Sequence, residues 1–187
     1  MKSIFNLTLA EFKALKPRPE MLAFAKSCDG DMRRFWNTCP NGEWLLWLLQ
    51  KTENFDELKA RKVALAYAKK VLPVFEKINP FDKNPRRCVR AIESFIKLPT
   101  VANQKLMMNA AYEIYATHAA YAAASAIYHA ARYYHATAAA SYAVHFATAA
   151  ADKIKAEHSF ASTIDAEARE KFARWGANKI RNLIPLK

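Results

Sequence analysis

Histidine and cysteine, the side chains that most often bind metals or act as nucleophiles, occur in this chain without the spacing that such sites use. The histidines are His118, His129, His135, His145 and His158. None of them forms an HxH, HxxxH or HExxH pair, so we expect no metal site. The cysteines are Cys28, Cys39 and Cys88, and no nucleophile motif flanks any of them. We therefore predict no metal, no cofactor and no catalytic residue.

Two other groups of residues could take part in catalysis, and neither favours it. The arginines around Cys88 could lower the pKa of its thiol, but a half-buried packing residue is the simpler interpretation. Glu43 and Glu76 lie in apolar stretches, where general acids and bases occur, but each could equally cap a helix or pair with an arginine. The chain has only three glycines and contains no GxGxxG or GxxxxGK loop. These features predict that the protein is not an enzyme.

The chain is strongly basic, with 29 Lys and Arg against 17 Asp and Glu and a formal net charge of +12. Most of the excess lies in residues 1–105, which hold 20 basic and 11 acidic residues. A basic surface attracts an acidic protein, a nucleic acid or a membrane, or it simply keeps the protein soluble. The residues predicted to contact a partner are Arg33, Arg34, Lys62, Arg86, Arg87 and Arg90. Further candidate phosphate contacts are Lys59, Arg61, Lys69, Lys70 and Lys83, although the lysines of residues 59–70 also have the spacing of an ordinary solvated helix face. No zinc-finger or RRM sequence accompanies these residues.

The segment from residue 110 to 151 is dominated by alanine, which fills 20 of its 42 positions. Alanine is the strongest helix former, and no Gly or Pro interrupts the segment. Seven of the eight tyrosines and four of the five histidines also lie there, several of them seven residues apart and therefore on one helix stripe. A possible pocket consists of His118, Tyr121, Tyr128, Arg132 and His135. The alternative is a set of core residues whose polar atoms bond to neighbours.

Length predicts that this segment forms two helices. One helix over residues 102–157 would be roughly 84 Å long at 1.5 Å per residue. A compact chain of this size has a radius of gyration of about 16 Å. We expect a break near residues 130–137, and one long helix in a homodimer is the alternative to a monomer. The longest apolar stretch, residues 136–151, contains Thr, Ser and His, so no membrane span is predicted.

Helix start and stop signals recur along the whole chain, and no strand-like alternation appears. We therefore predict an all-α, single-domain multi-helix bundle over residues 1–187, with basic short helices in 1–100 and long Ala-rich helices in 101–187. The signals are a capping box at Thr8 and Glu11, Pro19 at a first helical position, Asp31 as a cap, a turn at Asn41–Gly42, Asn84 as a cap before Pro85, and a last helix that opens at Ser162 or Thr163 and closes at Pro185. Pro73 predicts a kink or a break in a helical run. Trp44 and Trp47 share one face of the buried helix over 43–50, where a place in the core is favoured over a role as partner anchors.

Three pieces of sequence follow one another in a set order. They are Cys39-Pro-Asn-Gly-Glu-Trp-Leu-Leu-Trp-Leu-Leu49, Val71-Leu-Pro-Val-Phe-Glu76 and Asn84-Pro-Arg-Arg-Cys-Val-Arg-Ala-Ile-Glu93. Together with the alanine- and tyrosine-rich run that follows, they resemble the immunity-five-like family of predicted immunity proteins. The family-like positions are Gly42, Glu43, Trp44, Trp47, Pro73, Phe75, Glu76, Arg86 and Glu93. The family has an Arg-Pro-Arg order where this chain has Asn84-Pro-Arg-Arg, so only Arg86 fits it.

The resemblance implies an all-helical, non-enzymatic protein that binds and neutralises a toxin, and similar genes occur in phages. The expected function is therefore to block a protein partner by occlusion, as an immunity protein or a phage counter-defence inhibitor. The positive charge suits an acidic protein partner. The alternative is nucleic-acid binding through the basic N-terminal half, and a small-ligand binder or enzyme with a Tyr/His pocket is the third interpretation. The scattered cysteines and the lack of a recognisable secretory signal predict a cytoplasmic location.

Overall fold

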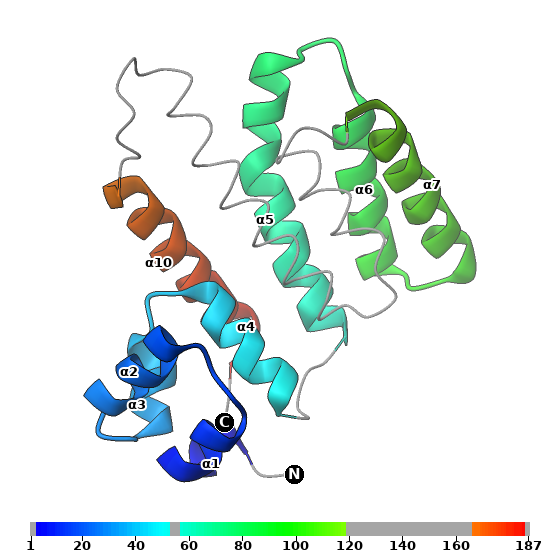
Figure 1. Cartoon of the computed structure of the whole chain (residues 1–187). Helices are drawn as coiled ribbons and strands as arrows, with labels where there is room; N and C mark the ends of the chain where they lie inside the picture. Colours follow the sequence, from blue (N-terminus) through cyan, green and yellow to red (C-terminus); the bar gives the residue numbers. More distant parts are fainter. Residues whose placement is uncertain (1–2, 53–56, 119–165, 186–187) are drawn as a thin grey trace.

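The computed structural model describes residues 3–52, 57–118 and 166–185, and every regular element in these ranges is a helix (Figure 1). The prediction of an all-α multi-helix fold is confirmed. The elements are a short 3-10 helix, η1 (Ile4–Asn6), and the α-helices α1 (Leu9–Ala14), α2 (Pro19–Ser27), α3 (Met32–Thr38), α4 (Gly42–Lys51), α5 (Glu57–Ile78), α6 (Asn84–Lys97), α7 (Val101–His118) and α10 (Ala166–Leu183). As predicted, α2 begins at its proline.

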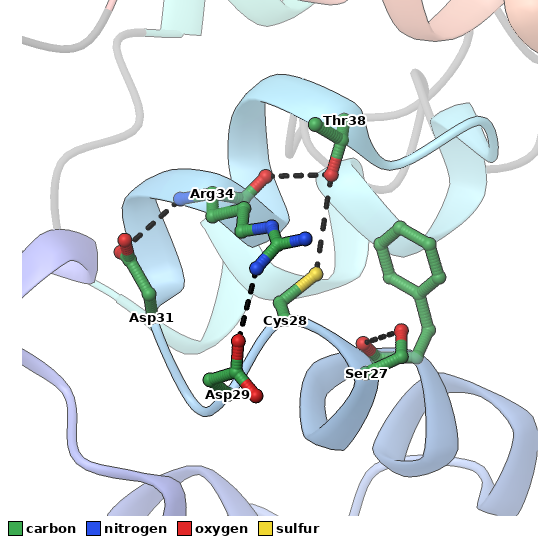
Figure 2. Close-up of polar contacts among 7 residues, drawn as sticks. Ser27, Cys28, Asp29, Asp31, Arg34 and Thr38 are labelled. Atoms are coloured by element: carbon green, nitrogen blue, oxygen red, sulfur yellow. Dashed lines mark hydrogen bonds and ion pairs between the residues drawn. The ribbon is translucent and has the colours of Figure 1, made fainter.

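The predicted caps of the first helices are confirmed. The Thr8 hydroxyl accepts a hydrogen bond from the Glu11 backbone N–H at 3.2 Å, and the Glu11 carboxylate accepts one from the Thr8 N–H at 2.9 Å. At the start of α3, the Asp31 carboxylate accepts from the N–H groups of Arg33 and Arg34 at 2.8 and 3.1 Å. Figure 2 shows the bond from Arg34. Each cap satisfies backbone donors that the first helical turn leaves without partners.

Two predictions at helix starts are wrong. Asn41 and Gly42 do not form a turn between elements, because the Asn41 side chain caps α4 and Gly42 is the first residue of that helix. Asn84 is not the cap of α6 but its first residue. The carboxylate of Asp82 accepts a hydrogen bond from the Asn84 N–H at 2.8 Å and so replaces the expected cap.

At Pro73 the sequence predicts a kink or a break, and the break is wrong, because α5 runs through the proline as one helix of 22 residues. This helix is the exception to the short helices expected before residue 100. A proline inside a helix costs about 3 kcal/mol. Leu72 and Phe75, on either side of the exposed proline, are 6% and 1% exposed. Since burying one such side chain contributes about 1.5–3 kcal/mol, packing offsets the cost of the proline.

The helices lie side by side in a simple order. In Figure 1, α10 lies along α4 and beside α5, while α6 packs on the other side of α5 and pairs with α7. The three short helices α1, α2 and α3 gather at the N-terminal end of the molecule. Buried apolar side chains from α1 to α7 and from α10 form one cluster that extends from Ile4 to Ile184.

Two glycines bring α4, α5 and α10 unusually close together around Tyr67. A Cβ atom on Gly42 would lie 2.7 Å from the Tyr67 hydroxyl oxygen. A Cβ on Gly176 would overlap that oxygen and lie 2.7 Å from the Tyr67 Cζ atom. The Tyr67 side chain is 1% exposed, and burial raises the pKa of its hydroxyl, so the group is neutral. Only a residue without a side chain fits at either position of this contact.

Several predictions lie outside the described residues. They are the Ala-rich helices beyond residue 118, the break near residues 130–137, the pocket residues Tyr121, Tyr128, Arg132 and His135, and the opening of the last helix at Ser162 or Thr163. His118 is the last residue of α7. No helix in the described ranges has the length and apolar character needed to cross a membrane.

Candidate functional site

Arg86, a residue predicted to contact a partner, is held in a contact within the chain. Its Nε and Nη2 atoms donate to the two carboxylate oxygens of Glu76 at 2.6 and 2.5 Å. The hydrogen bonds from Arg86 lower the pKa of the Glu76 carboxyl below its usual value. Bidentate hydrogen bonds of this kind are among the strongest interactions that arginine forms with a carboxylate. Arg86 therefore ties α6 to α5, which is the arginine pairing considered for Glu76 from the sequence.

Three more of the predicted arginines also have partners within the chain. Arg87 donates to the Glu113 carboxylate on α7 at 3.2 Å. Arg34 pairs with Asp29 at 2.9 Å (Figure 2), and the Arg33 guanidinium lies 4.2 Å from the centre of the Phe5 ring. Arg90 is exposed on α6. The predicted arginines thus lie on α3 and α6 rather than in one patch, and most of their charge is already balanced.

Arg61 was considered as a phosphate contact, and the structure shows that this is wrong. The residue is only 3% exposed, because it lies on the face of α5 that packs against α6. Its guanidinium is 5.8 Å from the centre of the Phe95 ring. A guanidinium over an aromatic face is attracted by the ring. Arg61 therefore acts in packing.

A groove of about 450 Å³ lies between α5 and α10 and gathers four lysines. Of the described residues, those that line it are Lys62, Leu65, Ala66, Lys69, Lys70, Trp175, Lys179 and Leu183. Lys62 was among the predicted partner contacts, and two more of these lysines were considered as phosphate contacts. The sequence interpretation missed the contribution of α10, which supplies one lysine together with a tryptophan and a leucine.

The lysines of the groove differ in how their charge is balanced. Lys69 forms an ion pair with Glu93 of α6. The Lys70 ammonium lies 5.4 Å from the centre of the Trp175 ring, in a cation–π contact. Lys62 and Lys179 form no ion pair with any residue that the structure describes. Four cations against one carboxylate leave the groove positively charged at neutral pH.

Trp175 forms part of the groove because of the packing around Tyr67. The centres of the two rings are 5.1 Å apart at an interplanar angle of 76°. Phe172, one turn earlier on α10, is 5.8 Å from Tyr67 and 5.6 Å from Trp175. Gly176 follows Trp175 directly and allows α10 to approach this cluster. The groove therefore depends on a close contact between helices. In the sequence, the only sign of this contact on α10 is Gly176, one of the three glycines of the chain.

A second hollow, of about 330 Å³, lies where α10 meets the end of α3, and its arginine has a structural role. Arg181 donates from Nε to the Trp36 carbonyl at 2.7 Å, from Nη2 to the Cys39 carbonyl, and from Nη1 to Asn178 at 2.9 Å. Partial burial lowers the pKa of this guanidinium, which still remains charged. These bonds fix α10 to the end of α3.

We predict that Arg181→Met lowers the free energy of unfolding by about 2 kcal/mol, because it leaves two partly buried carbonyl groups without a donor. Arg174→Met is the matched control on the same helix. Arg174 is exposed, and its one ion pair within the described residues is with Glu170, so its loss should cost less than about 0.5 kcal/mol. Urea denaturation followed by circular dichroism measures both values. Equal losses would show that Arg181 does not hold α10 in place.

The cysteines do not have the properties of nucleophiles. Burial raises the pKa of Cys39 to about 11 and that of Cys88 to about 12, so both thiols are protonated at neutral pH. Cys88 is fully buried rather than half-buried as predicted. Cys28 is also buried, and its sulfur lies 3.9 Å from the Thr38 hydroxyl (Figure 2). Among the described residues, no group of three or more His, Cys, Asp and Glu side chains is placed to hold a metal ion.

Trp44 and Trp47 pack against the hydrophobic core, which agrees with the packing role favoured from the sequence. Both are partly buried and pack against the apolar cluster. Trp44 lies 6.1 Å from Phe24, and Trp47 lies 6.1 Å from Phe12, measured between ring centres. Some of the other family-like residues also make contacts between helices: Gly42 approaches Tyr67, and Arg86 pairs with Glu76.

Comparison with known proteins gives no independent support for a family. No family model, curated protein or solved structure matches this chain. The resemblance to the immunity-five-like family stays a hypothesis carried by the sequence pieces named above.

Proposed function

We propose that this protein is a non-enzymatic binding protein that holds an acidic protein partner in the groove between α5 and α10 and blocks that partner by occlusion. The observation that carries the proposal is the gathering of four lysines with apolar side chains in one groove, three of the lysines being without an ion pair among the described residues. Complementary charge accelerates association and excludes partners of the wrong sign. Toxin immunity and phage counter-defence both fit a protein of this kind, acting in the cytoplasm.

The distribution of charged and apolar side chains in the groove favours a protein partner over a nucleic acid. Binding to nucleic acid needs cations spread along a phosphate backbone. Here Arg34, Arg86 and Arg87 pair with carboxylates among the described residues, and one groove brings four lysines together with leucine and tryptophan side chains. An apolar base contributes little to phosphate binding but adds affinity for a side chain. Nucleic acid is therefore the competing outcome of the test.

The test compares two probes of like charge by fluorescence anisotropy at about 150 mM salt. One is an acidic peptide of alternating glutamate and serine, and the other is a DNA duplex. We expect the peptide to bind at least as tightly as the duplex. Binding of the duplex alone would support the nucleic-acid alternative and overturn the proposal. Failure of both probes to bind would also overturn it.

Breaking the ion pair between Lys69 and Glu93 tests whether this lysine binds the partner, because a binding role predicts higher affinity and a purely structural role predicts lower affinity. Glu93→Gln should strengthen binding of the acidic peptide about threefold, because Lys69 is then free to bind the probe. The pair is substantially exposed, with side-chain exposures of 52% and 36%, so its loss should cost at most about 1 kcal/mol of stability. Glu113→Gln, on α7 away from the groove, is the matched control, and it should leave the affinity unchanged. Weaker binding by Glu93→Gln would argue that the glutamate only maintains the fold.

A further inference from the structure

Basic and apolar side chains line the groove together, and their order along α5 restricts what it can bind. Lys62 and Lys69 lie on the α5 side, and Lys179 lies on the α10 side. Leu65 lies about one helical turn from both Lys62 and Lys69 and therefore between them on α5, and Leu183 of α10 adds apolar surface to the groove. Both leucines are half-buried. A purely acidic ligand would satisfy the lysines and leave the apolar side chains of the groove in contact with water.

Resting on the proposed function, we infer that the segment bound in this groove is an extended acidic strand that carries one large apolar side chain between two carboxylates. The apolar side chain seats on the leucines, and the carboxylates meet the lysines on either side. An aromatic side chain suits this apolar surface best, because it buries the most area and stacks favourably with another aromatic ring, here that of Trp175.

The spacing of the lysines sets the spacing of the carboxylates. Lys62 and Lys69 are seven residues apart on α5, which is about 10.5 Å along a helix. In an extended strand, alternate side chains point to the same side, and residues four apart are separated by about 13 Å. The flexible stems of the lysines accommodate this difference. The pattern expected in the partner is therefore acid–x–aromatic–x–acid.

The experiment uses two peptides of alternating glutamate and serine in which the central glutamate is replaced by tryptophan or by serine. Their charges are equal, so only the apolar side chain differs. We expect the tryptophan peptide to bind the wild-type chain about tenfold more tightly in isothermal titration calorimetry. Equal affinities would overturn this inference and leave the proposed function standing. Failure of both peptides to bind would overturn the proposed function itself.

A variant locates the apolar contact on the groove. Leu183→Gln should remove most of the advantage of the tryptophan peptide while leaving the serine peptide unaffected. Leu106→Gln, on α7 and 60% exposed, is the matched control and should preserve the advantage. Circular dichroism confirms that each variant is folded. If the advantage persists in folded Leu183→Gln, the tryptophan seats elsewhere and the inference is wrong.

Discussion

Gly176→Ala should lower the free energy of unfolding by about 3 kcal/mol, although helix propensity alone predicts a gain of about 1 kcal/mol. The reason is the contact with Tyr67, whose hydroxyl oxygen occupies the place of the new methyl group. Tyr67 is 1% exposed and ringed by Phe172 and Trp175, so it has little room to move. The melting temperature should fall by roughly 9 °C. Thermal and urea denaturation followed by circular dichroism test this.

The control for this prediction removes the hydroxyl group. In a Tyr67→Phe background, Gly176→Ala should cost less, because the worst overlap is gone while the overlap with the ring carbon remains. The difference is the coupling energy of a double-mutant cycle. A second control, Asn182→Ala at an exposed position of α10, should be nearly neutral. Stabilisation by Gly176→Ala would mean that α10 does not pack against α5 as described, and the groove would lose its basis.

The second large effect concerns binding. Lys62→Glu combined with Lys179→Glu should weaken binding of the alternating glutamate–serine peptide by about 100-fold, which corresponds to about 2.7 kcal/mol. These two lysines have no ion pair among the described residues, and they lie on opposite sides of the groove. Reversing both charges removes two attractions and adds two repulsions to the same ligand. Fluorescence anisotropy at fixed salt measures the change.

A control with the same change in net charge distinguishes the groove from general charge. Lys13→Glu combined with Lys26→Glu reverses two exposed lysines on α1 and α2. Because charges beyond a Debye length are largely screened at about 150 mM salt, this variant should lose less than about threefold. Equal losses in the two double variants would show that the peptide responds only to net charge.

The local part of the fold could be predicted from the sequence. The capping box at Thr8 and the cap at Asp31 depend on hydrogen bonds within three residues, so the residue types alone decide them. The kink or break predicted at Pro73 rests on equally local chemistry, but the helix does not break there, because the burial of Leu72 and Phe75 offsets the cost of the proline. The prediction that Asn84 caps α6 was wrong by a small shift in position, because the Asp82 carboxylate accepts the hydrogen bond at the start of that helix.

The site was harder to predict, because it depends on which charges meet. The sequence marked Arg86 and Arg87 as contacts, yet both find carboxylates within the chain, Glu76 on α5 and Glu113 on α7. Only Lys62 among the predicted partner contacts lies in the groove. Its partner helix, α10, begins more than a hundred residues later, so no spacing within one helix could indicate the pairing. The residues at 175, 179 and 183 do follow helical spacing, and that was the available signal.

Nuclear magnetic resonance of the isotope-labelled full chain, titrated with the tryptophan-centred acidic peptide, tests the central claim most directly. The groove should produce the largest changes in backbone amide shifts at residues 62–70 of α5 and 175–183 of α10, with small changes in α1 to α3. Shifts concentrated on α3 or α6, or no shifts at saturating peptide, would contradict the assignment of the groove as the binding site.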